Sequence, residues 1–491
     1  MANIDLDLDP RGLRQERIKK LEELKQKGLE PYGGRFDRDY IISQAREKEA
    51  ELKDKKIKLC GRIMALRRHG QIYFADLRDE SGKIQIYIRR DTLGEEKISI
   101  FGLIDIGDFL GVEGTFFKTK TGELTLLVSD FLILSKSLRP LPEKWHGLKD
   151  VEIRYRQRYL DLLSNEKVRE TFRLRSEIIA GIRSFLYTRG FIEVETPMTQ
   201  PIPGGAEGRA FKTHHQALDM DLYLRIAPEL YLKRLLVGGM EKIFELNRSF
   251  RNEGLSPRHN PEFTMLEVYQ AYADYEVMME LTEEIISEVA KSVLGKEKIT
   301  YQGHEINLKR PWKREKFSQL MEEKFKINLE NATVENLVAE LKRIGLDKEK
   351  LEKGLSKTQL LKILADGIAP EDPTFVIDHL ASFCPLAKRH RDDKNLTQRF
   401  ELFIGGLEVA NAYSELNDPL EQRERLYEQW HELREEEKRE KKIDDEFILA
   451  LEYGMPPAGG LGIGIDRLVM LLTDSPTIRE VVFFPQLKPA A

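Results

Sequence analysis

The chain has 491 residues, of which 41% are hydrophobic and 33% are charged, and its net charge is −5. This length allows two or more domains with a large core. The negative charge excludes binding to nucleic acid through an overall positive field, so an RNA site would have to be a local patch. No apolar run has the length of a membrane span and the acidic N-terminus is unlike a secretion signal, so we expect a cytoplasmic protein. Cys60 and Cys384 have no CxxC motif or metal-ligand cluster beside them and are predicted to be buried free thiols.

Residues 1–56 are predicted to form a helical N-terminal extension. Within residues 11–30, Leu13, Arg17 and Leu24 fall near one helical stripe, and lysines and arginines occupy much of the rest. A solvated amphipathic helix explains this pattern. Contact with an RNA backbone is the alternative that the basic residues leave open.

Short strands separated by turns are predicted over residues 57–140. The candidate strands are residues 59–64, 72–77, 83–88, 109–114 and 124–128. Five short strands with turn signals favour a small barrel of the OB type, whose face binds single-stranded nucleic acid.

Three kinds of side chain in this barrel suit RNA binding. Phe74 could stack on a base, Gln85 could hydrogen-bond a base edge, and Arg67 and Arg68 could contact phosphate. From the residues alone, a place for Phe74 in the barrel core is the simpler interpretation.

A proline-punctuated linker is predicted over residues 141–165, followed by a second domain over residues 166–491. The second domain begins with a long amphipathic helix over residues 166–189. A charged, mostly helical insertion is predicted over about residues 276–397, and its sequence indicates no chemistry.

A glycine-rich loop at residues 201–208 precedes a further helix. At Gly205 the backbone could approach a ligand closely. Glu229 falls in the first turn of the helix, where a carboxylate is favourable even without a ligand.

The stretch from Lys242 to Tyr269 predicts two strands joined by a loop of turn-forming residues. Period-2 spacing puts Glu267 on the same face as Phe263 and Tyr269. An unpaired buried charge is very costly, so we expect Glu267 to have a cationic partner.

Cationic residues gather at the loop of this hairpin. Arg251, Arg258 and His259 could hold a polyanion there through guanidinium contacts. A salt-bridged hairpin without any ligand explains the same residues equally well.

Acidic residues recur between residues 400 and 415. Glu401, Glu408 and Glu415 are seven residues apart, which would also suit a solvated helical face. The apolar neighbours and the paired glycines near the middle favour a hairpin whose carboxylates point into a site, where hard cations could bind.

Three stretches, at residues 190–197, 248–269 and 459–472, resemble in their order the signature motifs of class II aminoacyl-tRNA synthetases. The middle stretch is similar to the form found in lysyl-tRNA synthetases of subclass IIb, and the resemblance covers nearly the whole chain. It implies an α+β multidomain fold, with an N-terminal OB-type β-barrel for the anticodon and an antiparallel catalytic sheet flanked by helices. It also implies an ATP-dependent ligase that activates L-lysine, releases pyrophosphate and transfers lysine to the 3′ end of tRNA(Lys).

The resemblance also implies residue roles and partners. For ATP it implies Arg251, Glu253, Arg258, His259, Asn260, Phe263, Glu401, Glu408 and Arg467. For lysine it implies Gly205, Glu229, Arg251, Glu267, Tyr269, Asn411 and Glu415. The implied catalytic residues are Arg251 and Arg467, and the implied ligands of more than one Mg²⁺ ion are Glu401 and Glu408. The implied anticodon contacts are Arg67, Phe74 and Gln85, and the implied assembly is a homodimer.

Other functions fit the sequence less well. A related protein that lysylates a protein would lack the barrel, and a lysyl-phospholipid synthase would need membrane spans. An RNA-binding protein with an inactive synthetase domain would not be expected to retain Arg251, Glu408, Glu415 and Arg467.

Overall fold

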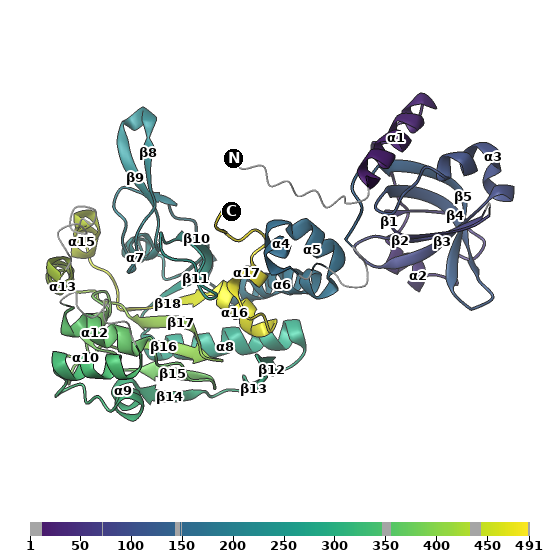
Figure 1. The fold of residues 1–491 in the computed structure, drawn as a ribbon. Helices are drawn as coiled ribbons and strands as arrows, with labels where there is room; N and C mark the ends of the chain where they lie inside the picture. Colours follow the sequence, from purple (N-terminus) through teal and green to yellow (C-terminus); the bar gives the residue numbers. More distant parts are fainter. Residues whose placement is uncertain are drawn as a thin grey trace. The chain divides into compact units, whose positions relative to one another are not determined.

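The computed structural model describes residues 12–70, 72–142, 148, 150–345, 355–432 and 443–489. Met1–Lys149 and Asp150–Lys488 form two compact units (Figure 1). The expected fold class, an OB-type barrel and a large antiparallel sheet flanked by helices, is confirmed. None of the helices in the described part of the chain is both long and apolar enough to span a bilayer.

The first unit is a closed five-stranded barrel with the strand order β1-β2-β3-β5-β4. Its elements are α1 (Leu13–Gln26), α2 (Ile42–Glu47), β1 (Ile57–His69), β2 (Ile72–Arg78), β3 (Lys83–Arg89), α3 (Arg90–Phe101), β4 (Phe109–Lys118) and β5 (Leu124–Ser135). Burial alternates along β2, where Tyr73, Ala75 and Leu77 enter the barrel core. Phe74 therefore faces outward, and its interpretation as a core residue is wrong.

Helix α1 is held to the barrel by a buried arginine. The Arg17 guanidinium donates hydrogen bonds to the carbonyl oxygens of Ile106 and Arg139, each at 2.9 Å. Arg17 is thus a structural anchor of the N-terminal helix.

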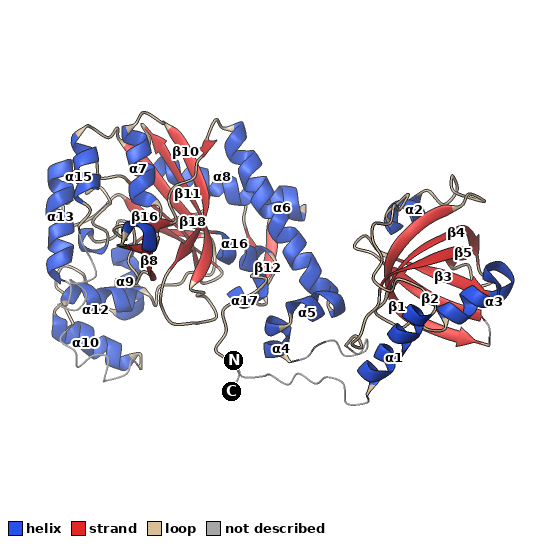
Figure 2. Ribbon diagram, turned by 90° about the horizontal axis from the view of Figure 1, so that it is seen from above, coloured by secondary structure: helices blue, strands red, loops and turns tan. Residues whose placement is uncertain are grey.

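The second unit is built on an eight-stranded sheet with the order β14-β15-β16-β17-β18-β11-β10-β6, antiparallel except at its two ends. Figure 2 shows strands of this sheet in red, with β10, β11 and β18 labelled. The strands are β6 (Ile192–Glu193), β10 (Lys242–Phe250), β11 (Glu262–Ala271), β14 (Lys313–Lys316), β15 (Thr374–Ile377), β16 (Arg399–Ile404), β17 (Leu407–Ser414) and β18 (Ala458–Gly464). Smaller sheets contain β7 (Thr199–Gln200), β8 (Lys212–His215), β9 (Met220–Leu224), β12 (Lys298–Tyr301) and β13 (His304–Asn307).

Helices cover both faces of this sheet. One face packs against α6 (Glu166–Thr188), α8 (Tyr275–Leu294) and α16 (Ile465–Leu472), and it carries the main apolar core. The opposite face packs against α7 (Glu229–Val237) and α15 (Asp445–Glu452). The remaining helices are α4 (Val151–Arg156), α5 (Arg158–Ser164), α9 (Phe317–Phe325), α10 (Val334–Arg343), α12 (Lys357–Ala365), α13 (Pro419–Glu432) and α17 (Ile478–Val481).

Parts of the expected organisation differ in the structure. Residues 151–164, which lie within the expected linker, form α4 and α5, and α5 packs on α6. Residues 276–397, expected to be an insertion, begin with α8 in the main core and include two strands of the large sheet. Both cysteines are free as expected, but they are half-buried rather than buried.

Candidate functional site

Functional side chains gather on the α7 face of the sheet because of the strand register. Glu267 on β11 and Asn411 on β17 flank Gly462 on β18. In the neighbouring row, Tyr269 and Tyr413 flank Gly460 in the same way. Alternate residues share a face of a strand, so these two rows form one surface with glycines along its middle.

The glycines leave room for side chains from the neighbouring strands. A Cβ atom at Gly460 would overlap the Glu415 carboxylate and would lie 2.7 Å from Tyr269 Cε1. At Gly462 a Cβ atom would lie 3.1 Å from Met265 Cε. The glycine-rich strand therefore forms the floor of an acidic site and leaves space for Glu415.

A second glycine brings the backbone close to the same site. Gly205 has a φ of 84°, and a Cβ atom there would lie 3.0 Å from Glu229 Cβ. The backbone at Gly205 therefore lies close to Glu229, and its expected approach to a ligand stays a prediction.

Glu229 and Glu415 are joined by a lysine that had no expected role. The Lys233 ammonium lies 2.7 Å from Glu229 Oε1 and 2.5 Å from Glu415 Oε2. The Tyr413 hydroxyl also donates a hydrogen bond to Glu229 Oε1, at 2.6 Å. Lys233 is one helical turn after Glu229, a signal in the sequence that is equally typical of an exposed ion pair on a helix.

Glu267 differs from its prediction. It is buried, and it has no ion pair with any described residue; its only side-chain hydrogen bond in that part of the chain comes from the Tyr269 hydroxyl at 3.2 Å. Burial and the nearby charge of Glu229 raise the pKa of Glu267 to about 8. The expected cationic partner is thus wrong: the free protein accommodates this group by protonation.

We expect Glu267→Gln to weaken the pH dependence of stability. The folded-state pKa of about 8 lies above the unfolded value of about 4.3. The folded protein therefore binds more protons between these values, and stability falls with rising pH by about 1.4 kcal/mol per unit. Glutamine cannot ionise, so calorimetry without ligands should show a smaller loss of Tm from about pH 6 to about pH 9.

The exposed Glu322 provides the control for this experiment. Glu322→Gln should lose stability with rising pH in parallel with the wild type. A parallel loss in Glu267→Gln as well would contradict the raised pKa.

Arg251 lies at the cationic end of the site. Its guanidinium carbon is 5.1 Å from the centre of the Phe263 ring, and its Nε has no hydrogen-bond partner among the described residues. The nearest acids act on it by charge alone, so the salt-bridged hairpin does not explain Arg251. The ion pair on this hairpin is instead Arg248–Glu262, at 3.7 Å.

The other implied nucleotide contacts lie near Arg251. Arg467 donates to Glu408 Oε2 at 3.0 Å and lies 3.2 Å from His259 Nε2. Partial burial and the charge of Arg467 lower the pKa of His259. Arg258 is exposed in the same loop. Arg467 and His259 thus lie together, beside a loop that also carries Arg258, and a polyphosphate could bind there.

Glu253 and Asn260 have different surroundings in this loop. Glu253 is exposed, and a Cβ atom at Gly208 would lie 3.0 Å from its Oε1. Asn260 is buried, and its amide donates to the Glu262 carbonyl at 2.6 Å. The Asn260 side chain therefore has a structural contact within the hairpin.

A buried arginine orients the Asn411 amide. Arg399 Nε donates to Asn411 Oδ1 at 3.1 Å, and Arg399 Nη2 donates to Glu401 Oε1 at 2.6 Å. Since the amide oxygen of Asn411 is engaged, its NH₂ group is the end that can donate to a substrate carboxylate. Arg399 was not singled out from the sequence.

The implied Mg²⁺ ligands lie on neighbouring strands, Glu401 on β16 and Glu408 on β17. Burial and the charges of these two glutamates raise the pKa of Asp366, a further carboxylate at the end of α12. The described residues contain no preformed group of three or more protein ligands. Mg²⁺ commonly uses one or two carboxylates together with substrate phosphates, so the pair Glu401 and Glu408 has the right chemistry for it.

The outer face of the barrel gathers the implied anticodon contacts. The Phe74 and Tyr87 rings stack with centres 4.7 Å apart, and Arg67 pairs with Phe74 across the strands. Thr125 donates to Gln85 Oε1 at 3.0 Å, which leaves the Gln85 NH₂ group to donate to a base. Tyr87 was missed, although its position two residues after Gln85 on a strand places it on the same face.

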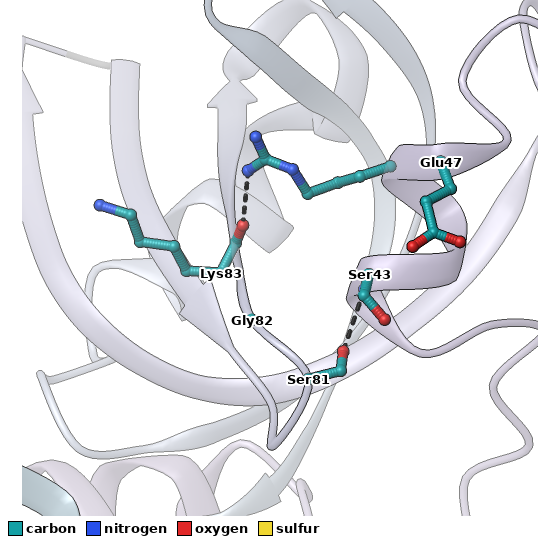
Figure 3. Close-up of a pocket in the computed structure, with 6 residues that line it drawn as sticks. Ser43, Glu47, Ser81, Gly82 and Lys83 are labelled. Atoms are coloured by element: carbon teal, nitrogen blue, oxygen red, sulfur yellow. Dashed lines mark hydrogen bonds between the residues drawn. The ribbon is translucent and has the colours of Figure 1, made fainter. Parts of the chain in front are cut away.

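A shallow pocket of about 310 Å³ lies elsewhere in the first unit, beside α2 (Figure 3). The Ser43 backbone NH donates to Ser81 Oγ, and the Arg46 guanidinium donates to the Lys83 carbonyl, both at 2.9 Å. None of the implied anticodon contacts lines this pocket, so we assign it no function.

Comparisons with known proteins agree with both units. Residues 150–488 match the family described as tRNA synthetases class II (D, K and N), and residues 57–134 match the OB-fold nucleic acid binding domain. The chain is 55% identical over 479 residues to the lysine–tRNA ligase of Carboxydothermus hydrogenoformans, covering 96% of this chain and 97% of the relative. The chain belongs to the lysine–tRNA ligase family.

Other members of the lysine–tRNA ligase family are similar over the same length. The lysine–tRNA ligase of Pelotomaculum thermopropionicum is 53% identical, covering 98% of this chain and 96% of the relative. The lysine–tRNA ligase of Thermotoga maritima is 50% identical, covering 97% of this chain and 96% of the relative. The resemblance inferred from the three sequence motifs is confirmed, as is the class of enzyme.

Proposed function

We propose that this chain joins L-lysine to ATP to form lysyl-adenylate and pyrophosphate, and then transfers lysine to the 3′ end of tRNA(Lys). The observation that carries the proposal is the buried acidic cluster of Glu229, Glu267 and Glu415. Its surplus of carboxylates suits a dicationic amino acid. Lys233 alone cannot balance three carboxylates, and an aspartate or asparagine substrate would add no second cation beside its α-ammonium.

In the first step, an oxygen of the lysine carboxylate attacks the α-phosphorus of ATP, and the bond from that phosphorus to the bridging oxygen of pyrophosphate breaks. The nucleophile is already ionised at neutral pH, so no general base is required. The obstacle is repulsion between two anions, and positioned cations and donors lower it. Arg251 would bridge the carboxylate and the α-phosphate, with the Asn411 NH₂ group on the carboxylate.

Lysine would be held by its two ammonium groups. Glu229, Glu267 and the Gly205 carbonyl would take the α-ammonium. Glu415 and the Tyr269 hydroxyl would take the ε-ammonium, which a neutral analogue lacks. Glu267 and Tyr269 lie on β11, which packs against α7, and Glu229 lies on α7 itself.

ATP would bind beside Arg251. Phe263 would stack on adenine and Glu253 would contact its edge. Arg467 would cover the opposite face or reach the triphosphate. The loop side chains Arg258, His259 and Asn260 would lie near the β- and γ-phosphates. In the second step, the terminal 3′-hydroxyl of tRNA attacks the adenylate carbonyl and AMP leaves.

Mg²⁺ is the metal implied for this family, and Glu401 and Glu408 would hold more than one ion. Bound Mg²⁺ would neutralise charge on the phosphate oxygens. The Arg399–Glu401 and Arg467–Glu408 ion pairs keep both carboxylates at this end of the site.

We also propose a homodimer that works in the cytoplasm. Three large apolar side chains are exposed between residues 187 and 198. They are Tyr187 at the end of α6 (54% exposed), Ile192 on β6 (54%) and Met198 (47%). They lie in or near the first signature motif, which forms the dimer interface in the family. Exposed apolar groups on neighbouring elements suit such an interface.

Pyrophosphate exchange into ATP, measured with each standard amino acid in turn, tests the proposed function. Exchange should depend on lysine, and charging assays should show transfer to tRNA(Lys). Exchange with aspartate or asparagine and none with lysine would overturn the proposal.

For the barrel, we expect Phe74→Ala to raise the KM for tRNA about 10- to 100-fold, since a stacked base is worth about 1–3 kcal/mol. Lysine-dependent pyrophosphate exchange should stay at the wild-type rate because the barrel is a separate unit. Tyr32→Ala, which removes an exposed aromatic side chain elsewhere in this unit, is the control for tRNA charging. An unchanged KM in Phe74→Ala would contradict the role of this face.

A further inference from the structure

One lysine side chain is completely buried within the acidic cluster. Lys233 and Glu229 are one turn apart on α7, so both project from the same side of the helix. The Lys233 ammonium contacts Glu229 at 2.7 Å and Glu415 at 2.5 Å, and its side chain has no solvent exposure. It therefore links carboxylates that lie far apart in the sequence.

Aromatic rings enclose the ammonium. Lys233 Nζ lies 5.6 Å from the centre of the Tyr413 ring and 6.0 Å from that of Phe447. These rings come from β17 and α15, so, together with α7, three elements meet around the ammonium. A charge buried so deeply is costly unless carboxylates compensate it.

The charges of the cluster do not balance. Besides Glu229 and Glu415, the third carboxylate of the cluster is Glu267, and the hydroxyls of Tyr269 and Tyr413 and the thiol of Cys384 are titratable groups beside it. Glu245 and Arg225, which form an ion pair with each other, and Arg251 also act on Glu267 by charge. When the acids are ionised, three carboxylates face one ammonium, and the cluster lacks two positive charges. A lysine substrate carries two ammonium groups.

Glu415 retains capacity for a further partner. Its Oε2 lies 2.5 Å from the Lys233 ammonium, but its Oε1 has no hydrogen-bond partner among the residues that the structure describes, although the exposed fraction of Glu415 is only 1%. Buried carboxylates normally accept such bonds. The backbone of Gly460, which has no side chain, lies directly beside this carboxylate.

We propose that Lys233 is a positioning and specificity-determining residue of the lysine site, which holds Glu229 and Glu415 in place and leaves the cluster two positive charges short when its acids are ionised. This inference rests on the proposed lysine activation. Lys233 acts through the two carboxylates. A monocationic amino acid would leave one buried carboxylate unpaired and would be rejected.

The charge of Lys233 should also set the pH range in which lysine binds. Burial lowers the pKa of Lys233, but Glu229 and Glu415 more than offset this and raise it above its ordinary value, so the ammonium stays charged. Burial raises the pKa of Glu415 to about 8, although the positive charge of Lys233 lowers it. Removing this ammonium should raise the pKa of the carboxyl groups further and shift lysine binding to higher pH.

Lys233→Met tests the proposal, since methionine fills a similar volume without the charge. Lysine-dependent pyrophosphate exchange would be measured from about pH 6 to about pH 10, first on the wild type. At about pH 7 the variant should lose roughly 100-fold or more in kcat/KM for lysine, with KM for ATP within about twofold. The midpoint of the plot of kcat/KM for lysine against pH should move upward by about one unit. Lys233→Arg should restore part of the lost kcat/KM and part of the shifted midpoint.

The outcomes separate the possible explanations. If Lys233→Met has lower activity at every pH but an unshifted midpoint, Lys233 has only a structural role and the proposal is overturned. Unchanged activity in Lys233→Met would also overturn it. If Lys233→Met does not fold, the double variant Lys233→Met/Glu229→Gln replaces it. This variant removes one positive and one negative charge, so the cluster is still two positive charges short, and the midpoint of its pH profile of kcat/KM should equal that of the wild type. A different midpoint would also overturn the proposal. No lysine-dependent exchange in the wild type would instead contradict the proposed function itself.

Discussion

Arg251→Gln should lower kcat for lysine-dependent pyrophosphate exchange by about 1,000-fold, the effect of losing a positioned charge in the transition state. The reaction brings a carboxylate up to a phosphate, and negative charge increases at phosphorus during attack. The Arg251 guanidinium carbon lies over the Phe263 ring at 5.1 Å, and its Nε has no partner among the described residues. Its donors are therefore available to both anions.

Two further variants separate charge from geometry. Arg251→Lys keeps the charge but loses the planar pair of donors, and it should still lose about 100-fold in kcat. Arg248→Gln is the matched control, since Arg248 lies on the same hairpin and pairs only at 3.7 Å with Glu262. We expect its kcat to stay close to wild type. Equal kcat values for Arg251→Gln and Arg248→Gln would refute the bridging role.

The sheet and its acidic face could be predicted from the sequence because their signals are local. The period of two along β11 places Glu267 and Tyr269 on one face, and the apolar neighbours and paired glycines of residues 400–415 favour a hairpin whose carboxylates point into a site. Likewise, the turn residues and short strands of residues 57–134 were enough to predict the barrel. In these segments, side-chain direction follows from strand geometry alone.

The electrostatic balance of the site could not be predicted in this way. Lys233 looks like half of an exposed helical ion pair, because its second partner, Glu415, is remote in the sequence. The same limit applies to Arg399, whose role depends on the register between β16 and β17. The expected cation for Glu267 was wrong because burial, and after it the charge of Glu229, raises the pKa of this acid, and neither can be read from the sequence around it.

Glu415→Gln should reduce kcat/KM for lysine by about 1,000-fold, because a buried ammonium would lose its carboxylate and gain only a neutral amide. ATP binding should persist, since Glu415 lies in the lysine cluster with Lys233, and the nucleotide contacts lie around Arg251 and Arg467. Exchange kinetics and calorimetric titration with ATP measure the two quantities separately. Glu424→Gln, an exposed position on α13, should behave as wild type in both. Unchanged lysine-dependent exchange in Glu415→Gln would refute the assignment of this carboxylate.

Gly460→Ala should reproduce the Glu415→Gln phenotype without altering any charged group. Its Cβ atom would overlap the Glu415 carboxylate, which Lys233 holds in place, so Glu415 would have to leave its position. Gly464→Ala on the same strand is the matched control, since its Cβ atom would lie 3.7 Å from the nearest atom, the Val409 carbonyl oxygen, which is an ordinary van der Waals contact. If Gly460→Ala activated lysine as well as Gly464→Ala does, the position of Glu415 would not matter for lysine recognition. A loss confined to Gly460→Ala, with ATP binding intact, would show that this glycine is required because it leaves room for the carboxylate that recognises lysine.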